Sequence, residues 1–158
     1  MSFDEFDSLV NKPQGSQPPP AKHPIVVIDD DESIRDNLAL LLGDRYRVTL
    51  CASAKEGLNA VDEDVCAVIV DIKMPRQDGF WACAYIRKKV PDVPIIFYSA
   101  YHDVKDPYSI INEFRPFGYV DKGDDIQKLV DILNVAVQLQ AIIIFNRRLI
   151  QKLQGPAR

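Results

Sequence analysis

Residues 67–79 read AVIVDIKMPRQDG, a run of four apolar residues that ends at Asp71 and passes into a loop. A short, continuous apolar run of this kind is typical of a strand buried in a parallel sheet. Asp78-Gly79 then indicates a turn into a following helix. A carboxylate placed directly after such a strand predicts a functional group at the carboxyl edge of an α/β sheet.

Three further apolar runs end next to a polar or charged side chain. Residues 25–28 run into Asp29-Asp30-Asp31, residues 94–98 run into Ser99, and residues 118–121 precede Lys122. Groups at the carboxyl ends of parallel strands converge on one crevice, so we expect acids, a hydroxyl and an ammonium to meet there. Such a set suits a divalent cation and a phosphoryl group.

Helical stretches separate these runs, so strands and helices alternate along the chain. We expect strands at 25–28, 46–51, 65–70, 94–98 and 117–120, and helices at 33–43, 54–61, 80–89 and 107–114. This alternation predicts right-handed crossovers with helices on both faces of the sheet. The expected fold class is therefore α/β, with a doubly wound, five-stranded parallel sheet.

At these residues the chain closely resembles the receiver domain of two-component response regulators. The resemblance covers about residues 24–139 and rests, in chain order, on Asp29-Asp30, the Asp-x-x-Met-Pro-x-x-Asp-Gly run from Asp71, Ser99-Ala100 and Lys122. It implies the flavodoxin-like strand order 2-1-3-4-5. We expect a Pro-rich N-terminal arm at 1–24, a receiver domain at 25–138 and an extension of the last helix at 139–158.

The resemblance implies that Asp71 is the phosphoacceptor, a carboxylate nucleophile that becomes an acyl phosphate. It also implies that Asp29, Asp30 and Asp71, with the backbone carbonyl of Lys73, hold Mg²⁺ or Mn²⁺, since such hard cations favour oxygen ligands.

The other implied roles concern the phosphoryl group and its loss. Lys122 would pair with Asp71 and then with a phosphoryl oxygen, and Ser99 would donate its hydroxyl to another. Tyr119 matches the family's switch aromatic. Lys73 and Tyr101 would flank the water that attacks the phosphoryl group, and their bulk predicts a long-lived phosphorylated state.

The chain departs from the family's pattern at Gly123, because the family usually has proline after the lysine. Glycine supplies backbone freedom but no preset bend, so the geometry of this loop stays open.

The last helix is longer than the domain needs. Gly123-Asp124-Asp125 predicts its start and Gly155-Pro156 its end, so about 30 residues form a rod of roughly 45 Å. One stripe should pack on the sheet: Ile126, Leu129, Val130, Leu133 and Val137. A second stripe with 3-4 heptad spacing is Ile132, Val135, Leu139, Ile142, Asn146, Leu149 and Leu153. From Leu139 onward the helix should outrun the domain and leave residues 142–145 without an intradomain partner, which predicts a homodimer. The alternatives are that it folds back on its own domain, against Phe3 and Phe6, or waits for a kinase helix.

The composition limits the remaining possibilities. The 158 residues are 47% hydrophobic with a formal net charge of −4, which suits one domain and argues against a nucleic-acid face. We do not expect the acidic start of the chain to be a signal peptide, and residues 141–145 are too short to span a membrane. Cys51, Cys66 and Cys83 lack metal-ligand spacing and are expected to be reduced core thiols of a cytoplasmic protein.

We therefore expect a stand-alone signalling switch of a two-component system or phosphorelay rather than an enzyme. It would accept a phosphoryl group from a histidine kinase or a histidine phosphotransfer protein, catalyse only its own phosphoryl transfer and dephosphorylation, and signal by protein–protein contacts. We expect no output domain after the last helix. Two alternatives stay open: a dimeric interaction module and a receiver fragment of a larger kinase or regulator.

Overall fold

The computed structural model describes residues 21–100 and 106–155. It contains a five-stranded parallel sheet in the order β2-β1-β3-β4-β5, which confirms the predicted strand order. The strands are β1 (His23–Ile28), β2 (Tyr46–Cys51), β3 (Ala67–Val70), β4 (Ile95–Ser99) and β5 (Gly118–Asp121). Strands β1 and β3 lie at the centre, and all four residues of β3 are buried.

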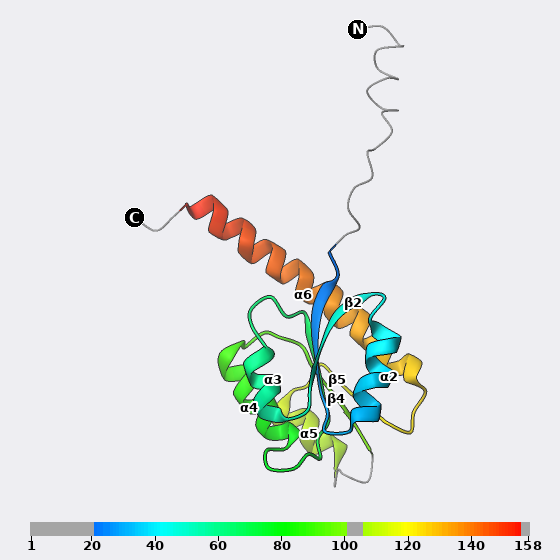
Figure 1. The fold of residues 1–158 in the computed structure, drawn as a ribbon. Coiled ribbons are helices and arrows are strands. Elements are labelled where there is room, and N and C mark those ends of the chain that lie inside the picture. Colours follow the sequence, from blue (N-terminus) through cyan, green and yellow to red (C-terminus); the bar gives the residue numbers. More distant parts are fainter. Residues whose placement is uncertain (1–20, 101–105, 156–158) are drawn as a thin grey trace, which may run out of the picture.

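Helices cover both faces of the sheet (Figure 1). On one face, α3 (Ala54–Ala60), α4 (Gly79–Lys89) and α5 (Pro107–Phe114) contribute to a core that includes Val68 and Phe97. On the other face, α2 (Glu32–Leu42) and α6 (Ile126–Gln154) pack on a core that includes Val27 and Ile69. Two separate cores, one on each face, are what a doubly wound sheet requires.

A side chain caps the start of each described helix. Asp31, Ser53, Asp78, Asp106 and Asp125 each accept a hydrogen bond from a backbone N–H in the first turn that follows. These caps satisfy N–H groups that have no partner inside the helix. Each cap is the last residue of the loop that follows a strand, so the caps also fix where these loops end.

Helix α6 packs further along the domain than we expected. Leu129, Val130, Leu133 and Val137 are buried as predicted, whereas Ile126 is 37% exposed. The expectation that residues 142–145 lack an intradomain partner is wrong for Ile144, which is 7% exposed and joins the core on this face. Ile144 lies on the underside of the helix, where the chain at the start of β1 comes close to it.

Two ion pairs anchor the same part of α6. Arg147 pairs with Asp92 and Arg148 with Asp64, each at 2.5 Å. Beyond them the helix extends away from the domain (Figure 1). By length and composition alone α6 is apolar enough to cross a membrane, but 39% of its most apolar window is buried inside the domain.

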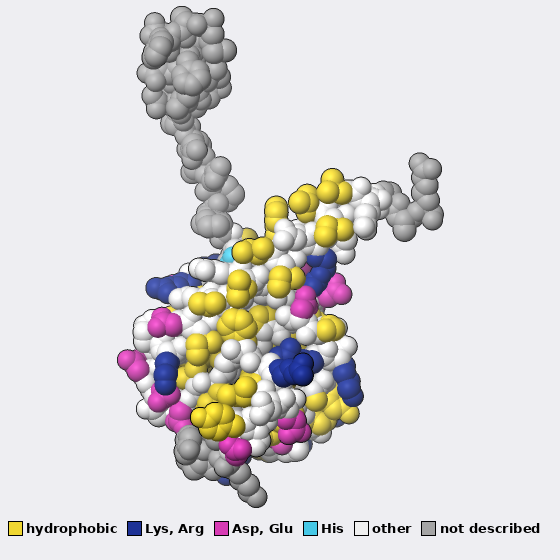
Figure 2. Space-filling view, turned by 180° about the vertical axis from the view of Figure 1, so that it is seen from behind, with side chains coloured by type: hydrophobic (Ala, Val, Ile, Leu, Met, Phe, Trp, Pro, Cys, Tyr) yellow, Lys and Arg dark blue, Asp and Glu magenta, His cyan; other side chains and the backbone are white. Residues whose placement is uncertain are grey.

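The second stripe of α6 is exposed, as the heptad spacing predicts. Val135, Leu139, Ile142, Leu149 and Leu153 are 44–79% exposed, and Asn146 is also exposed. Figure 2 shows apolar side chains along the protruding part of the helix. Ile132 is the exception, because its side chain is half-buried against Gly118 of β5.

Candidate functional site

Three aspartates lie together at the carboxyl edge of the sheet. Asp29 and Asp30 follow β1, Asp71 follows β3, and one carboxylate oxygen of each lies within 4.8 Å of the others. The strand register causes this, because Ile28 pairs with Val70 and the residues after them become neighbours. Asp29 and Asp71 are buried, at 2% and 6% exposure, whereas Asp30 is exposed.

A hydroxyl and an ammonium reach Asp71 from the two strands beyond β3. Ser99, the last residue of β4, donates its hydroxyl to Asp71 Oδ1 at 2.8 Å. Lys122 Nζ lies 3.5 Å from Asp71 Oδ2 and only 2.7 Å from Asp29 Oδ2. The Lys122 backbone N–H donates to the Ser99 carbonyl, so pairing between these strands continues to the site. The Lys122 ammonium therefore forms ion pairs with two buried carboxylates.

The charges in this site are unevenly balanced. Burial raises the pKa of the Asp71 carboxyl above its ordinary value; the Ser99 hydrogen bond opposes this, and the Asp29 charge adds to it. Burial alone would lower the pKa of Lys122, but its hydrogen bond to Asp29 and the charges of Asp29 and Asp71 outweigh this and raise it. Lys122 is therefore a persistent cation, and Asp71 carries a charge that its surroundings only partly compensate.

The donor set is suited to a hard divalent cation. Three carboxylates near one point repel one another, and a divalent cation with oxygen ligands removes that repulsion. Asp29 Oδ1 is held by the Asp31 backbone N–H at 2.9 Å, which orients the carboxylate. Asp31 itself caps α2 through Ser33, which leaves Asp29, Asp30 and Asp71 as the cluster compatible with metal binding.

Two contacts at this site were not predicted from the sequence. Arg35 of α2 donates from Nη1 to the Asp29 backbone carbonyl at 2.8 Å, which fixes the chain at the end of β1. Gly79, the first residue of α4, lies so close to the loop that an added Cβ would sit 2.2 Å from the Asp71 carbonyl oxygen. The Asp78-Gly79 pair signalled only a turn, and nothing local indicates that Gly79 meets the Asp71 backbone.

The remaining predicted residues lie near the site or outside the described part. Lys73 is exposed in the loop after Asp71, and Tyr119 is half-buried on β5, where it packs against the core. Tyr101 lies outside the described residues, so its predicted role stays a prediction. At Gly123 the backbone N–H donates to Asp121 Oδ1 at 2.6 Å, so a side-chain-capped turn forms where the family usually has proline.

This fold and site define a class: α/β domains whose buried acidic cluster, hydroxyl and lysine meet at the carboxyl edge of a 2-1-3-4-5 sheet. The family model for the response regulator receiver domain matches residues 25–134. The chain therefore belongs to the response regulator receiver family.

Comparisons with individual proteins agree with this family assignment. The chain is 34% identical over 84 residues to the response regulator MprA of Mycolicibacterium vanbaalenii, a match that covers 52% of this chain and 36% of that protein. It is 40% identical over 87 residues to the probable transcriptional regulator ycf27 of Porphyridium aerugineum, covering 54% of this chain and 36% of the relative. The match thus spans about a third of the length of these relatives.

Solved structures show the same fold. A response regulator receiver domain protein from Clostridium thermocellum superposes with a TM-score of 0.68 at 29% identity, covering 76% of this chain and 98% of that one. The structure described as adenylate cyclase from Rhodopirellula baltica gives a TM-score of 0.71 at 20% identity, over 82% of this chain and 97% of that one. At that identity the likeness concerns the fold alone.

Proposed function

We propose that this receiver domain accepts a phosphoryl group on Asp71 from a histidine kinase or a histidine phosphotransfer protein and acts as a cytoplasmic signalling switch. The observation that carries the proposal is the buried Asp71 carboxylate, which Ser99 and Lys122 contact beside two more aspartates. A structural aspartate would not need a lysine and two further carboxylates around it. The chain is in this view a switch and acts on no substrate besides its own phosphoryl group.

The proposed transfer needs mainly positioning and charge compensation. An Asp71 carboxylate oxygen forms a bond to phosphorus while the donor's N–P bond breaks, and the electron pair leaves with the imidazole nitrogen. Lys122, already within 3.5 Å of Asp71, pairs with a phosphoryl oxygen. A divalent ion held by Asp29, Asp30 and Asp71, with the Lys73 carbonyl, would supply further positive charge toward the phosphoryl oxygens.

The switch is proposed to begin at Ser99. Its hydroxyl now donates to Asp71 Oδ1, and it also lies 3.4 Å from the Ile72 backbone N–H. Once that carboxylate carries a phosphoryl group, the hydroxyl moves to donate to a phosphoryl oxygen. Tyr119 follows into the space near β4, since Tyr119 pairs with Phe97 in the neighbouring strand.

An apolar surface beside the site supports contact with a protein donor. Leu40 and Leu41 of α2 are 82% and 44% exposed, and Ile126 at the start of α6 is 37% exposed. Leu41 and Ile126 line a shallow pocket of about 220 Å³ together with Tyr98, whose ring lies below Lys122. Exposed apolar residues grouped in this way indicate an interaction site.

The phosphoacceptor proposal is tested by intact mass. Incubation with Mg²⁺ and acetyl phosphate should add one phosphate to the wild-type protein, and Asp71→Asn should abolish the addition. Asp36→Asn, an exposed aspartate on α2, is the matched control and should still be phosphorylated. Equal acyl phosphorylation of the Asp71→Asn variant would show that the acceptor is another residue.

We also propose that the protein pairs with a second copy through the second stripe of α6. Five of its apolar residues are exposed, and Asn146 occupies an a-type position, which favours two parallel strands in one register. Exposed apolar residues aligned along one helix face indicate an interaction site. A dimeric module that uses the fold for assembly would share this interface, but would not need the acidic cluster.

Sedimentation at micromolar concentration tests the pairing. Ile142→Asp with Leu149→Asp should convert a dimer into a monomer, because two buried charges would face each other across the helix pair. Gln151→Asp with Gln154→Asp adds the same charge to exposed positions outside the stripe and should leave the dimer intact. A wild-type protein that sediments as a monomer excludes this interface.

A further inference from the structure

A groove lies at the amino-terminal edge of the sheet, at the opposite end from Asp71. It has a volume of about 500 Å³ and is enclosed by the chain that leads into β1, the start of β2, the loop before β3 and the underside of α6. We call it the α6 groove. The residues that matter for its chemistry are Lys22, Arg47, Asp64, Ile144, Phe145 and Arg148.

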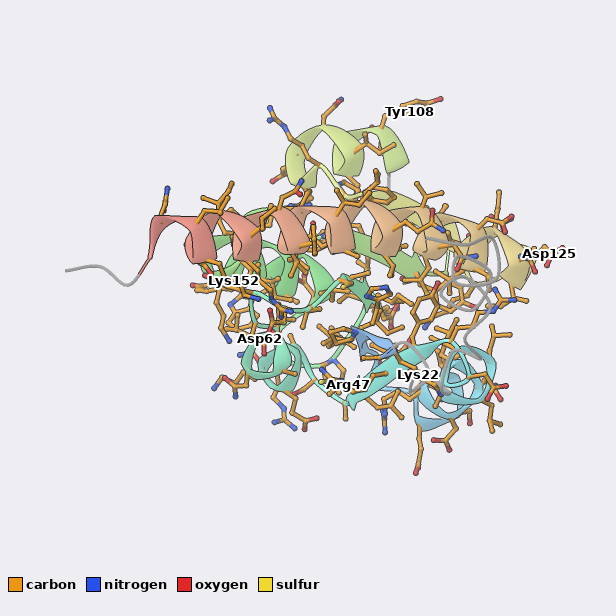
Figure 3. All side chains as sticks on the ribbon, turned by 90° about the horizontal axis from the view of Figure 1, so that it is seen from above. Lys22, Arg47, Asp62, Tyr108, Asp125 and Lys152 are labelled. Atoms are coloured by element: carbon orange, nitrogen blue, oxygen red, sulfur yellow. The ribbon has the colours of Figure 1, made fainter. Side chains whose placement is uncertain are left out.

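The α6 groove carries an excess of positive charge. Three cations line it against one carboxylate, and that carboxylate, Asp64, is already paired with Arg148. Lys22 Nζ donates to the Gly43 carbonyl, a neutral group that leaves its charge uncompensated. Arg47 is exposed and forms no ion pair with any carboxylate in the described part of the chain. Lys22 and Arg47 lie on the same side of α6 (Figure 3).

The same groove has an apolar wall. Ile144 forms its buried base, and Phe145 stands beside it with 65% of its surface exposed. An aromatic ring exposed next to uncompensated cations suits an occupant that is both acidic and apolar, since each part of it would find a complementary partner.

The first ten residues of this chain have that composition. They contain Asp4, Glu5 and Asp7 but no lysine or arginine, and three of their five apolar residues, Phe3, Phe6 and Val10, are spaced three and four apart. Their acidic and apolar residues match the cations and the aromatic wall of the α6 groove.

The groove lies within reach of this segment along the chain. The described structure begins at Ala21, which itself lines the groove. Residues 11–20 of the sequence include four prolines and would span about 31 Å at the polyproline II rise of 3.1 Å per residue. The groove face of α6, from Ala141 to Arg148, is only about 10 Å long. A segment tethered this closely has an effective concentration in the millimolar range, so weak contacts suffice.

We propose that residues 1–10 bind in the α6 groove of their own chain, with Phe3 and Phe6 against Phe145 and the three acids near Lys22 and Arg47. The segment would occupy a face of α6 roughly a third of a turn from the stripe proposed for pairing, because each residue advances the helix by about 100°. Binding of the segment and pairing of two copies are therefore compatible, and neither depends on phosphorylation.

A spin label on the segment tests the proposal in the full chain. The three cysteines are buried, so a Ser8→Cys variant can be labelled selectively. The label should broaden the NMR signals of Arg47, Cys66 and residues 141–148. Arg47→Glu should reduce this broadening severalfold, whereas Arg45→Glu, an exposed arginine two residues away that does not line the groove, should leave it unchanged.

Three outcomes would overturn the proposal. Broadening confined to residues 21–24 would mean that the segment does not bind, and broadening centred on another surface would place it elsewhere. In a mixture of isotope-labelled wild-type protein and unlabelled spin-labelled protein, broadening as strong as in the single-species sample would mean that the segment binds a second copy. Broadening that weakens as salt rises supports the charge pairing.

Discussion

Replacing Asp71 with asparagine should make the protein more stable at neutral pH, although it removes the proposed phosphoacceptor. Asp71 is 6% exposed and one of its carboxylate oxygens lies within 4.8 Å of one of Asp29, so at an effective dielectric constant of about 20 the two charges repel by at least about 3.5 kcal/mol. Lys122, at 3.5 Å, attracts the Asp71 charge by about 4.7 kcal/mol, and the exposed Asp30 repels it by about 1 kcal/mol. These terms nearly cancel, so the cost of burying the carboxylate decides the sign.

Asparagine has the same shape, still accepts the Ser99 hydrogen bond and leaves Lys122 paired with Asp29. We therefore expect the free energy of unfolding to rise by about 1–2 kcal/mol, a shift of about 2–8 °C in Tm for a chain of this size. Urea denaturation of the two proteins at pH 7 measures the difference. Asp36→Asn, which neutralises an exposed aspartate, should change it by less than about 0.5 kcal/mol.

The stability difference between the Asp71→Asn variant and the wild type should depend on pH. The pKa of Asp71 is raised in the folded protein, so the folded state holds this proton more tightly than the unfolded chain does. The stability of the wild type therefore falls, relative to the variant, as pH rises from the ordinary value of 3.8 through the raised pKa, and the difference is constant above it. A variant less stable than the wild type at pH 7, or a difference that does not shrink toward pH 4, would refute this account.

Three further substitutions have effects whose direction follows from the sequence or the structure. Lys73→Ala with Tyr101→Ala should shorten the lifetime of the phosphorylated protein about tenfold, because smaller side chains admit the attacking water; an unchanged rate of phosphate loss by intact mass would contradict this. Gly79→Ala should destabilise the fold by about 1–3 kcal/mol in urea, since the new Cβ would sit 2.2 Å from the Asp71 carbonyl oxygen, and it should also slow phosphorylation. Gln140→Leu should stabilise the fold by about 1 kcal/mol, because Gln140 is 1% exposed and its Nε2 has no hydrogen-bond partner in the described part of the chain; a loss of stability would mean that the amide is satisfied.

Local signals in the sequence sufficed for the sheet and for the position of the acidic residues. A four-residue apolar run followed by a polar side chain indicates both a buried strand and the edge at which it ends, and the alternation with helices dictates parallel pairing. Asp71, Ser99 and Lys122 could therefore be assigned to one edge of the sheet from the amino-acid sequence alone. The start of α6 at the Asp125 cap and its end before Gly155 were also readable, because caps and glycine stops act within a few residues.

Contacts between segments far apart in the chain were decided only by the tertiary structure. That Lys122 lies nearer to Asp29 than to Asp71, and that Arg35 holds the Asp29 carbonyl, depends on how β1, α2 and β5 are placed relative to one another. The burial of Ile144 and the groove beneath it depend on where α6 crosses the start of β1, which lies at the other end of the domain's sequence. A heptad pattern gives the face of a helix but not the point at which its domain stops covering it, because that point is set by the packing of distant strands.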